Sequence, residues 1–477
     1  MNSLRICVLR DEPVRGDGGF VLYWMVAARR TRHTFALQRA VAIARKARRP
    51  LLVLEALRAG YPYASDRLHR FVIDGMADNA ARLRAAGVAY HPYVEPRPGD
   101  GKGLVAALAR HACAVVTDDF PAFFLPKMLA AAAAQVPCRL EAVDGNGLLP
   151  VRVADRAFPT AYAFRRFVQA RLAAWVADAP APDPLGGPGL PRLPGLPDGV
   201  AERWPATEES IDLARLPIDH DVPPAPIRGG EAAARERLHD FVAQRLDAYD
   251  ADRNHPDRDA TSGLSPYLHF GHVSAHEVFA AVAPGWAAPP EGRRPDGRRD
   301  GWWGLDPSRE AFLDQLVTWR ELSFNRSALR EDAATYDGLP PWARRTLEAH
   351  ALDPRQHLYS LDDLESARTH DPLWNAAQRQ LVREGRLHNT LRMLWGKKVL
   401  EWSPSPREAF ERMTHLNDRY ALDGRDPNSA AGIAWCLGLF DRPWGPERPI
   451  FGTVRYMSSQ NTARKVAVRE YLRRHGP

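Results

Sequence analysis

Residues 20–54 read FVLYWMVAARRTRHTFALQRAVAIARKARRPLLVL, and this stretch decides the fold of the first third of the chain. Two short apolar runs, Phe20–Trp24 and Pro50–Leu54, have the length and composition of buried strands. Between them, Phe35–Lys46 carries apolar residues at helical spacing. The stretch therefore predicts a strand, a helix and a second strand in succession.

The same alternation continues beyond this stretch. Helical patterns and strand-like runs follow each other over His69–Ala86, Val88–Val94, Gly103–Ala112, Cys113–Thr117, Leu125–Ala134 and Cys138–Val143. Regular alternation of this kind predicts an α/β domain with an open, mostly parallel sheet and helices on both faces. The only early glycine cluster, Gly16–Gly19, precedes the first strand of the stretch instead of following a strand. A dinucleotide fingerprint is thus absent, and NAD or FAD is not expected in this domain.

The second half of the chain has a different pattern. From about Glu231 onward it is almost wholly helical, with examples at Ala232–Tyr249, Arg309–Asn325, Pro372–Glu384, Leu387–Glu401 and Ser405–Leu416. Residues 178–200 are rich in proline and glycine, which disfavour both helix and strand. We interpret them as part of an interdomain connection, the alternative being a surface insertion within one domain. The predicted organisation is an α/β domain over 1–175, a linker over 176–228 and an all-α domain over 229–477.

Composition narrows the classes of protein. Apolar residues make up 45% of the 477 residues and charged residues 26%, as in ordinary globular proteins. The net charge of +7 suits a polyanionic partner without requiring one. The four cysteines are scattered and form no CxxC pair, so neither a disulfide framework nor a structural zinc site is expected. This cysteine usage is typical of a protein of the reducing cytoplasm. No stretch has the roughly 20 apolar residues of a membrane span, and the N-terminal residues lack the apolar core of a secretion signal.

Two segments of the helical part have unusual composition. TSGLSPYLHFG (261–271) offers serine and glycine before a helix, which suits either a phosphate cradle or an ordinary helix cap. Trp319-Arg320-Glu321-Leu322 places two charges late in an apolar helix, where buried charges must be paired or used. A structural Arg–Glu pair explains this second segment as well as a functional role does.

Two further segments follow. THDPLWNAAQRQLVREGRLHNTLRMLWGKKVLEW (369–402) contains Trp374, Trp395 and Trp402, and the seven-residue spacing of the last two places them on one helix face, about 10 Å apart. Such indoles either belong to a core or pass electrons. LNDRYALDGRDPNSAAGIAW (416–435) is a dense polar run between apolar helices. It is either a ligand cradle or a network of helix caps.

Taken together, these segments resemble the class II photolyases that act on cyclobutane pyrimidine dimers (CPD), in the cryptochrome/photolyase family. The motifs SGLSPYLHFG, THDPLWNAAQ, RM–W–KK–LEW, LNDRYALDGRDPN, AGIAW and FGTVRYM occur in order over roughly residues 230–460. VLYWM, TDDFP and PTAYAFRRF extend the resemblance into the N-terminal half. The resemblance implies light-driven repair of these dimers in DNA by a carbon–carbon lyase. In that reaction excited FADH⁻, the reduced active form of FAD, lends an electron to the dimer and recovers it.

The resemblance also implies which residues bind FAD in the helical domain. Those matching the family's contacts near the pyrophosphate are Tyr249, Ser262, Gly263, Leu264 and Ser265. Those matching contacts around the ring system and ribose are Arg320, Asn389, Arg392, Asn417, Asp423 and Asp426. We expect an ion pair between Arg392 and Asp423, and an amide of Asn417 close to flavin N5, where it can donate or accept.

The same resemblance assigns the tryptophans and the lesion pocket. Trp395 would lie next to the flavin, with Trp374 as relay and Trp402 as the outer donor of a photoreduction chain. Residues matching the pocket for a flipped-out dimer are Glu321, Met393, Trp435 and Trp444, with Arg442, Arg464 and Lys465 as phosphate contacts. Glu321 would hydrogen-bond the pyrimidine edge. No metal is implied, and the implied partner is dimer-containing DNA, with no membrane and no obligate protein partner.

Some positions depart from the family pattern. Asn389 stands where class II members often carry glycine, and 324–327 is less apolar than usual. Ala27–Arg30 and Thr34 differ from the more polar pattern of the family, which leaves a deazaflavin or other antenna chromophore in the sheet domain open. The alternative function is a cryptochrome-like FAD photoreceptor without repair. A photolyase for (6-4) lesions and a basic nucleic-acid-binding protein without photochemistry explain the motifs less well.

Overall fold

The computed structural model describes residues 1–208 and 211–477, which form two compact units. The first unit comprises Met1–Asp155, Arg171–Asp240 and Gly263–Ala288. The second comprises Arg156–Ala170, Phe241–Ser262 and Pro289–Pro477. Each unit is therefore built from three separate stretches of sequence. The described residues of the segment expected to act as a linker, 176–228, all group with the first unit.

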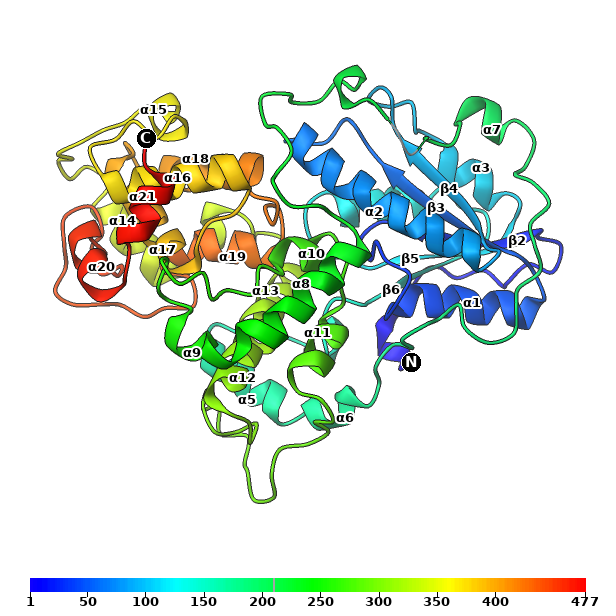
Figure 1. Cartoon of the computed structure of the whole chain (residues 1–477), viewed down its shortest axis with the longest axis horizontal. Coiled ribbons are helices and arrows are strands. Elements are labelled where there is room, and N and C mark those ends of the chain that lie inside the picture. Colours follow the sequence, from blue (N-terminus) through cyan, green and yellow to red (C-terminus); the bar gives the residue numbers. More distant parts are fainter. Residues whose placement is uncertain (209–210) are drawn as a thin grey trace. The chain divides into compact units, whose positions relative to one another are not determined.

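The first unit contains a six-stranded sheet in the order β1-β6-β5-β2-β3-β4 (Figure 1). Its strands are β1 (Ile6–Arg10), β2 (Phe20–Met25), β3 (Leu51–Leu57), β4 (Ala89–Val94), β5 (Ala112–Asp118) and β6 (Arg139–Val143). Strands β2 to β6 pair in parallel, and β1 pairs antiparallel with β6 at the edge. The parallel sheet confirms the fold predicted for this part of the chain. Strand β1 was not predicted, because half-exposed residues give it no clean apolar run.

Alternate side chains of β2 belong to two hydrophobic cores, one on each face of the sheet. Phe20, Leu22 and Trp24 face one core, which α3 (Leu104–Ala109) and α4 (Leu125–Ala133) complete. Val21, Tyr23 and Met25 face the other core, which α1 (Phe35–Ala47) and α2 (Asp66–Ala85) complete. All six residues of β2 are buried, as expected for a parallel strand covered on both sides.

Shorter helices complete the first unit. They are η1 (Ser3–Arg5), η2 (Val151–Val153), α6 (Leu172–Val176), α7 (Val200–Arg203), η3 (Leu213–Arg215), α10 (Ser265–His269) and α11 (Ala275–Val282). Helix α8 (Glu231–Gln244) starts in the range of the first unit and ends in that of the second. Residues 178–199 contain neither helix nor strand, as their proline and glycine content predicts.

The second unit is largely helical, also as predicted. Its helices are α5 (Ala161–Gln169), η4 (Leu246–Ala248), α9 (Tyr249–Asp252), α12 (Pro307–Leu313), η5 (Asp314–Trp319, a π-helical turn), α13 (Arg320–Leu329), η6 (Tyr336–Gly338), α14 (Pro341–Ala349), α15 (Leu361–Glu365), α16 (Pro372–Glu384), α17 (Asn389–Trp402), α18 (Pro406–Tyr420), α19 (Pro427–Cys436), α20 (Ser459–Lys465) and α21 (Arg469–His475). Helix α17 packs against α16, α18 and α19, and α13 packs against α19.

One boundary in this unit differs from the sequence-based expectation. The polar run 416–435 was expected to connect two helices, but α18 continues to Tyr420 and α19 begins at Pro427. The reason is that Leu416 and Tyr420, four residues apart, are both buried and extend the apolar face of α18 by one turn. Only residues 421–426 form the connection, so several of the polar residues are held on helices.

Candidate functional site

Three buried tryptophans form a continuous series in the second unit. Trp395 and Trp402 lie on α17, as their spacing predicted, and Trp374 lies on α16. The rings of Trp374 and Trp395 are parallel within 2°, with 6.5 Å between centroids. Trp374 also meets Trp402 edge to face at 5.5 Å. Trp374 thus contacts both other indoles, which is the arrangement that a relay between them needs.

Hydrogen bonds fix the orientation of two of these rings. Trp374 Nε1 donates to the backbone oxygen of Trp395 at 3.0 Å, and Trp395 Nε1 donates to Oε1 of Gln378 at 2.9 Å. The N-terminus of α16 is capped by Asp371, whose carboxylate accepts from the backbone N–H of Trp374. Trp374 is therefore held by the cap of its own helix and by the neighbouring helix.

A polar cluster surrounds Arg392, one turn before Trp395 on α17. Arg392 Nη1 reaches Oδ1 of Asn417 and Oγ of Ser429, both at 3.4 Å, and Nη2 reaches Oδ2 of Asp423 at 3.4 Å. The expected ion pair between Arg392 and Asp423 is therefore present. Ser429 also donates to Oδ1 of Asn417 at 3.1 Å. Helices α17, α18 and α19 each contribute to this cluster.

The donors and acceptors of this cluster fit a polar ligand. The three contacts of Arg392 are at the long end of hydrogen-bond geometry. Oδ1 of Asp423 is buried and has no hydrogen-bond partner among the described residues. A buried carboxylate oxygen without a donor costs about 1–3 kcal/mol, and a ring N–H or a ribose hydroxyl would satisfy it. The chemistry of this site therefore fits the flavin and ribose groups of FAD.

The remaining predicted FAD contacts occupy several positions. Asp426 is the N-cap of α19, where it accepts from the backbone N–H of Asn428 at 2.8 Å, so one of its oxygens has a capping role. Asn389 is the first residue of α17 and is exposed. Arg320 is buried on α13, with its guanidinium 4.4 Å from the ring centroid of Phe324. Tyr249 begins α9 and is buried.

The serine- and glycine-rich segment is divided between the units. Ser262 belongs to the second unit, whereas Gly263, Leu264 and Ser265 belong to the first. Gly263 has a φ of +66°, and a Cβ at this position would approach the side chain of Arg237 to 2.7 Å. The positive φ favours glycine here, whereas the guanidinium of Arg237 is the mobile end of a side chain and can move aside. Leu264 is the N-cap of α10 and makes no side-chain cap bond.

The predicted lesion residue Trp435 has a partner that sequence reasoning missed. Trp319 stacks on Trp435 with 4.5 Å between centroids and 17° between planes. Trp319 ends the π-helical turn, in which it and Gln315 are the only side chains that are not fully buried. Insertions of this kind into α-helices are frequent at functional sites. The sequence contained a signal for Trp319, because this residue directly precedes Arg320 and Glu321, the two charged residues expected in an apolar helix.

The other predicted lesion residues lie on the same packed helices or on the segment after α19. Met393 is half-buried on α17, and Glu321 is buried on α13. Beyond α19, two guanidinium groups lie close to the ring of Trp444, those of Arg442 at 4.7 Å and Arg455 at 5.1 Å from its centroid. A cationic and aromatic surface of this composition suits nucleic acid. Arg464 and Lys465 lie in the last turn of α20.

In the first unit, the buried carboxylate of Asp118 lies at the carboxyl end of β5. The strand order reverses between β2 and β5, and the carboxyl ends of strands at such a point are the usual ligand site. Here Oδ2 of Asp118 accepts from the backbone N–H groups of Val26, Ala27 and Ala28 at 2.8–2.9 Å, and Oδ1 accepts from Tyr23 at 2.8 Å. These three backbone N–H groups are thus engaged internally.

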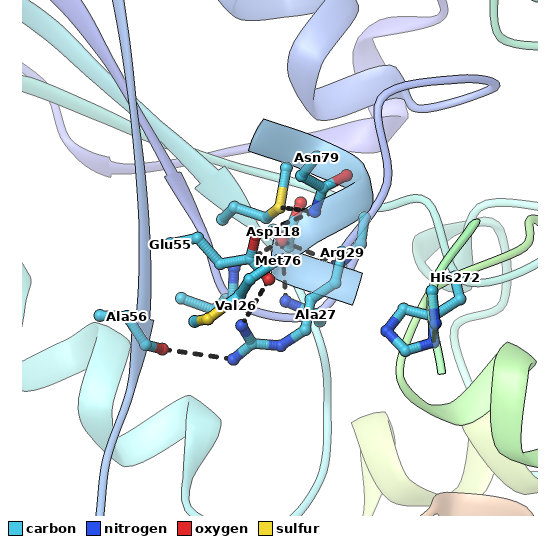
Figure 2. Close-up of polar contacts among 12 residues, drawn as sticks. Val26, Ala27, Arg29, Glu55, Ala56, Met76, Asn79, Asp118 and His272 are labelled. Carbon is cyan, nitrogen blue, oxygen red and sulfur yellow. Dashed lines mark hydrogen bonds and ion pairs between the residues drawn. The ribbon is translucent and has the colours of Figure 1, made fainter. Parts of the chain in front are cut away.

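Figure 2 shows the neighbouring polar contacts in the same unit. Arg29 forms a buried ion pair with Glu55 at 3.0 Å, and Asn79 and Tyr90 also donate to Glu55. Arg30 donates to the backbone oxygen of Gly271 at 2.9 Å. The residues that depart from the family pattern, 27–30, are therefore parts of an internal network.

Two further properties concern the described residues as a whole. Within 1–208 and 211–477, no group of three or more His, Cys, Asp or Glu side chains is arranged to hold a metal ion. No helix in these ranges is long and apolar enough to cross a lipid bilayer.

Comparison with known proteins gives full-length similarities. No protein-family model matches the chain. A protein named deoxyribodipyrimidine photo-lyase from Methanothermobacter thermautotrophicus is 35% identical over 475 residues, covering 99% of this chain and 98% of that protein. One of the same name from Potorous tridactylus is 33% identical, covering 99% of this chain and 83% of its own. Among solved structures, a bacterial class III photolyase from Agrobacterium tumefaciens has the same fold, with a TM-score of 0.72 and 18% identity over 96% of this chain and 86% of that one.

Proposed function

The chain belongs to the deoxyribodipyrimidine photo-lyase family, and on that premise we propose that it is a class II enzyme that uses light to repair cyclobutane pyrimidine dimers in DNA. The observation that carries this proposal is similarity over almost the whole length of both proteins in the first comparison, because function then does not rest on one domain alone. The alternative of a photoreceptor without repair finds no support in the relatives above.

FAD is the cofactor that the proposal requires, and it supplies the photoexcited electron donor when bound. The residues of the second unit that would hold it are Arg392, Asn417 and Asp423, together with Tyr249 and Arg320. The buried Oδ1 of Asp423 supports this assignment, because it needs a donor that the described residues do not provide. Asn417 receives hydrogen bonds at Oδ1, and its Nδ2 donates to Asp418 at 2.8 Å, so its orientation is set.

Trp395, Trp374 and Trp402 would restore the reduced cofactor from its oxidised form. Their contacts support the order Trp395, Trp374, Trp402, since Trp374 touches both of the others. These residues would not take part in dimer cleavage, which needs no nucleophile and no metal.

Dimer recognition would rest on the stacked pair of Trp319 and Trp435, together with Met393 on α17. A flipped-out dimer needs apolar and π surfaces, which two indoles provide. Glu321 remains the predicted partner of the pyrimidine edge. Gln315 is a second candidate, because it shares one face of the π-helical turn with Trp319 and is less buried than Glu321. Comparison of Glu321→Gln with Gln315→Leu in a repair assay separates the two.

The surface around Trp444, with Arg442 and Arg455, would meet the DNA backbone. We infer a cytoplasmic enzyme that works on DNA without an obligate protein partner. In the first unit, the backbone N–H groups of Val26, Ala27 and Ala28 already donate to Asp118, so an antenna chromophore there would have to use other donors.

The test is a repair assay with the purified protein. The protein should carry FAD, and blue light with a reductant should convert a dimer-containing oligonucleotide to intact thymines, as measured by chromatography. The same sample in the dark, and an oligonucleotide with a (6-4) lesion, are the controls and should remain unchanged. Bound FAD without dimer repair in the light would refute the proposal and favour the photoreceptor.

A further inference from the structure

Residues 253–262 of the second unit, here called the cofactor segment, contain neither helix nor strand. Two predicted FAD contacts frame this segment: Tyr249 begins the short helix before it, and Ser262 is its last residue. A stretch without a helical or strand ladder must find partners for its backbone groups elsewhere in the protein. The partners of the cofactor segment therefore determine where Ser262 is held.

The start of α21 supplies several of these partners, although it lies more than 200 positions later in the chain. The backbone N–H of Ala467 donates to Nδ1 of His255 at 3.1 Å, and the backbone N–H of Asp257 donates to the oxygen of Ala467 at 3.3 Å. The backbone N–H of Tyr471 donates to Oδ1 of Asp257 at 2.7 Å. The cofactor segment is thus bonded to α21 through backbone and side-chain groups.

Asp257 acts as the cap of α21. The N-cap residue of this helix, Val468, makes no side-chain cap bond. The carboxylate of Asp257 takes that role, because it accepts one of the first-turn N–H groups that have no partner within the helix. The helix and the cofactor segment therefore stabilise each other, and loss of this bond loosens both.

The side chain of Tyr471 connects α21 to a further predicted FAD contact. Helix α21 packs against α16 (Figure 1), where the hydroxyl of Tyr471 donates to Oε1 of Gln380 at 2.8 Å. The same oxygen accepts the backbone N–H of His388 at 3.2 Å, and His388 is the N-cap of α17, directly before Asn389. Tyr471 and Gln380 are 2% and 4% exposed. One buried oxygen therefore connects α21 with the start of α17.

A second path runs from α21 through the end of α16 to the cofactor segment. Nδ1 of His475 lies 3.7 Å from Oε1 of Glu384. Arg386 donates from Nε to Oε2 of Glu384 at 2.7 Å and from Nη1 to Oδ1 of Asp259 at 3.1 Å. Asp259 has a φ of +45°, a left-handed conformation that persists only where surrounding contacts hold it. Arg386 thus fixes the backbone three residues before Ser262.

We propose that α21 is a positioning helix for the cofactor and that its contacts set the rate at which FAD leaves the protein. The inference rests on the proposed function, in which Tyr249, Ser262 and Asn389 contact FAD. Release requires these contacts to open together with the backbone that carries them. Each bond between α21 and that backbone therefore adds to the barrier for release.

The first experiment measures FAD release from the holoenzyme in the dark, as the rise of flavin fluorescence after dilution. Asp257→Ala should speed release about three- to thirtyfold, because it removes the cap of α21. Tyr471→Phe should speed it about two- to tenfold, since it loses the hydroxyl bond to Gln380. Asp257→Asn keeps an oxygen that accepts the N–H of Tyr471 and should release FAD at close to the wild-type rate.

A matched control separates positioning from a general loss of stability. Ser360→Ala removes the cap of another short helix of the second unit, α15, and should leave FAD release unchanged. Urea denaturation of each variant without FAD gives its stability. Release that follows stability across all variants, Ser360→Ala included, would reduce α21 to a structural role and overturn the proposal.

The second experiment uses the reciprocity of coupled equilibria. If α21 holds FAD, then FAD must also stabilise α21. Backbone hydrogen exchange over residues 467–475, measured by mass spectrometry in the dark, should therefore slow when FAD is bound to the wild type. The effect should be smaller in Asp257→Ala, and exchange over 361–365 of α15 should not respond. Equal exchange over 467–475 with and without FAD would overturn the proposal.

Failure of this inference differs from failure of the proposed function. Repair in the light by the wild type, with FAD release unchanged in Asp257→Ala and Tyr471→Phe, refutes the role of α21 and leaves the enzyme assignment standing. Faster release in both variants of a protein that does not repair dimers supports the role of α21 and refutes the enzyme assignment.

Discussion

Trp374 stacks on Trp395 with an interplanar angle of 2°, although the two residues lie on different helices and 21 positions apart. Trp374 also donates a hydrogen bond from Nε1 to the backbone oxygen of Trp395, at 3.0 Å. Trp374 also meets the ring of Trp402 edge to face, so it connects the two outer indoles of the series, Trp395 and Trp402. Removal of this one indole therefore interrupts the whole series.

Trp374→Phe should reduce photoreduction of oxidised FAD to the background level, because the shorter ring breaks both contacts of the relay. Dimer repair by chemically reduced enzyme should stay close to that of the wild type. The measurement is flavin absorbance under blue light with reductant, with Trp286→Phe in the first unit as control. Loss of repair by the reduced enzyme together with photoreduction would contradict this division of roles.

Asp423→Asn should weaken FAD binding by about ten- to a hundredfold, since it removes the ion pair with Arg392 and a charged acceptor. The measurement is the dissociation constant of FAD for protein freed of its cofactor. Asp362→Asn removes an exposed partner of Arg368 and should change nothing, because exposed ion pairs contribute little. Unchanged FAD affinity in Asp423→Asn would remove this carboxylate from the cofactor site.

The local sequence pattern predicted the helices that carry these residues. It did not predict which of the side chains contact each other. The seven-residue spacing of Trp395 and Trp402 placed both on one helix, and that helix is α17. Their contact with Trp374 depends on how α16 packs against α17, and no local pattern contains this information. The resemblance to a family supplied it instead.

The features that the sequence did not predict also depend on contacts that a local pattern does not contain. Strand β1 is half-exposed and pairs with β6, which lies more than 120 residues later, so its stability comes from the partner. The sequence did not predict the last turn of α18. The buried face of that turn consists of Leu416, Asn417 and Tyr420, and the polar Asn417 interrupts the apolar pattern that would indicate a helix. Trp319 was read as a helix residue next to two charges, and its partner Trp435 lies on α19.

Lys397→Met should stabilise the protein at neutral pH. Lys397 on α17 is 1% exposed, and burial lowers its pKa to about 8, although nearby Cys436 and Asp441 favour its charge. Between pH 8 and about 10.5 the unfolded chain holds this proton and the folded chain does not, so the contribution of Lys397 to the free energy of unfolding rises with pH across that window. Below pH 8 the cost of burying the charge is fully present.

The variant should therefore gain about 1–3 kcal/mol in the free energy of unfolding at pH 7, and the gain should shrink towards pH 10.5. Urea denaturation of both proteins at pH 7 and pH 10 measures the difference. Lys127→Met, at an exposed position, is the control and should show no such pH dependence. A variant that is less stable than the wild type at pH 7 would mean that the charge of Lys397 is well compensated.

Trp435→Ala should lower the affinity for dimer-containing DNA more than the affinity for undamaged DNA. The indole of Trp435 is half-buried and stacks on Trp319 at 4.5 Å, so one of its faces is supported by protein while the pair offers a flat surface to extruded bases. Stacking of one base on an aromatic side chain contributes about 1–3 kcal/mol, which corresponds to a loss of about five- to 150-fold in affinity. Undamaged duplex keeps its bases stacked and never uses this surface, so its binding should change little. Trp435→Phe retains a ring and should recover most of the discrimination, as measured by competition between damaged and undamaged oligonucleotides. Equal losses for both DNAs would instead place Trp435 in backbone binding or in the stability of α19.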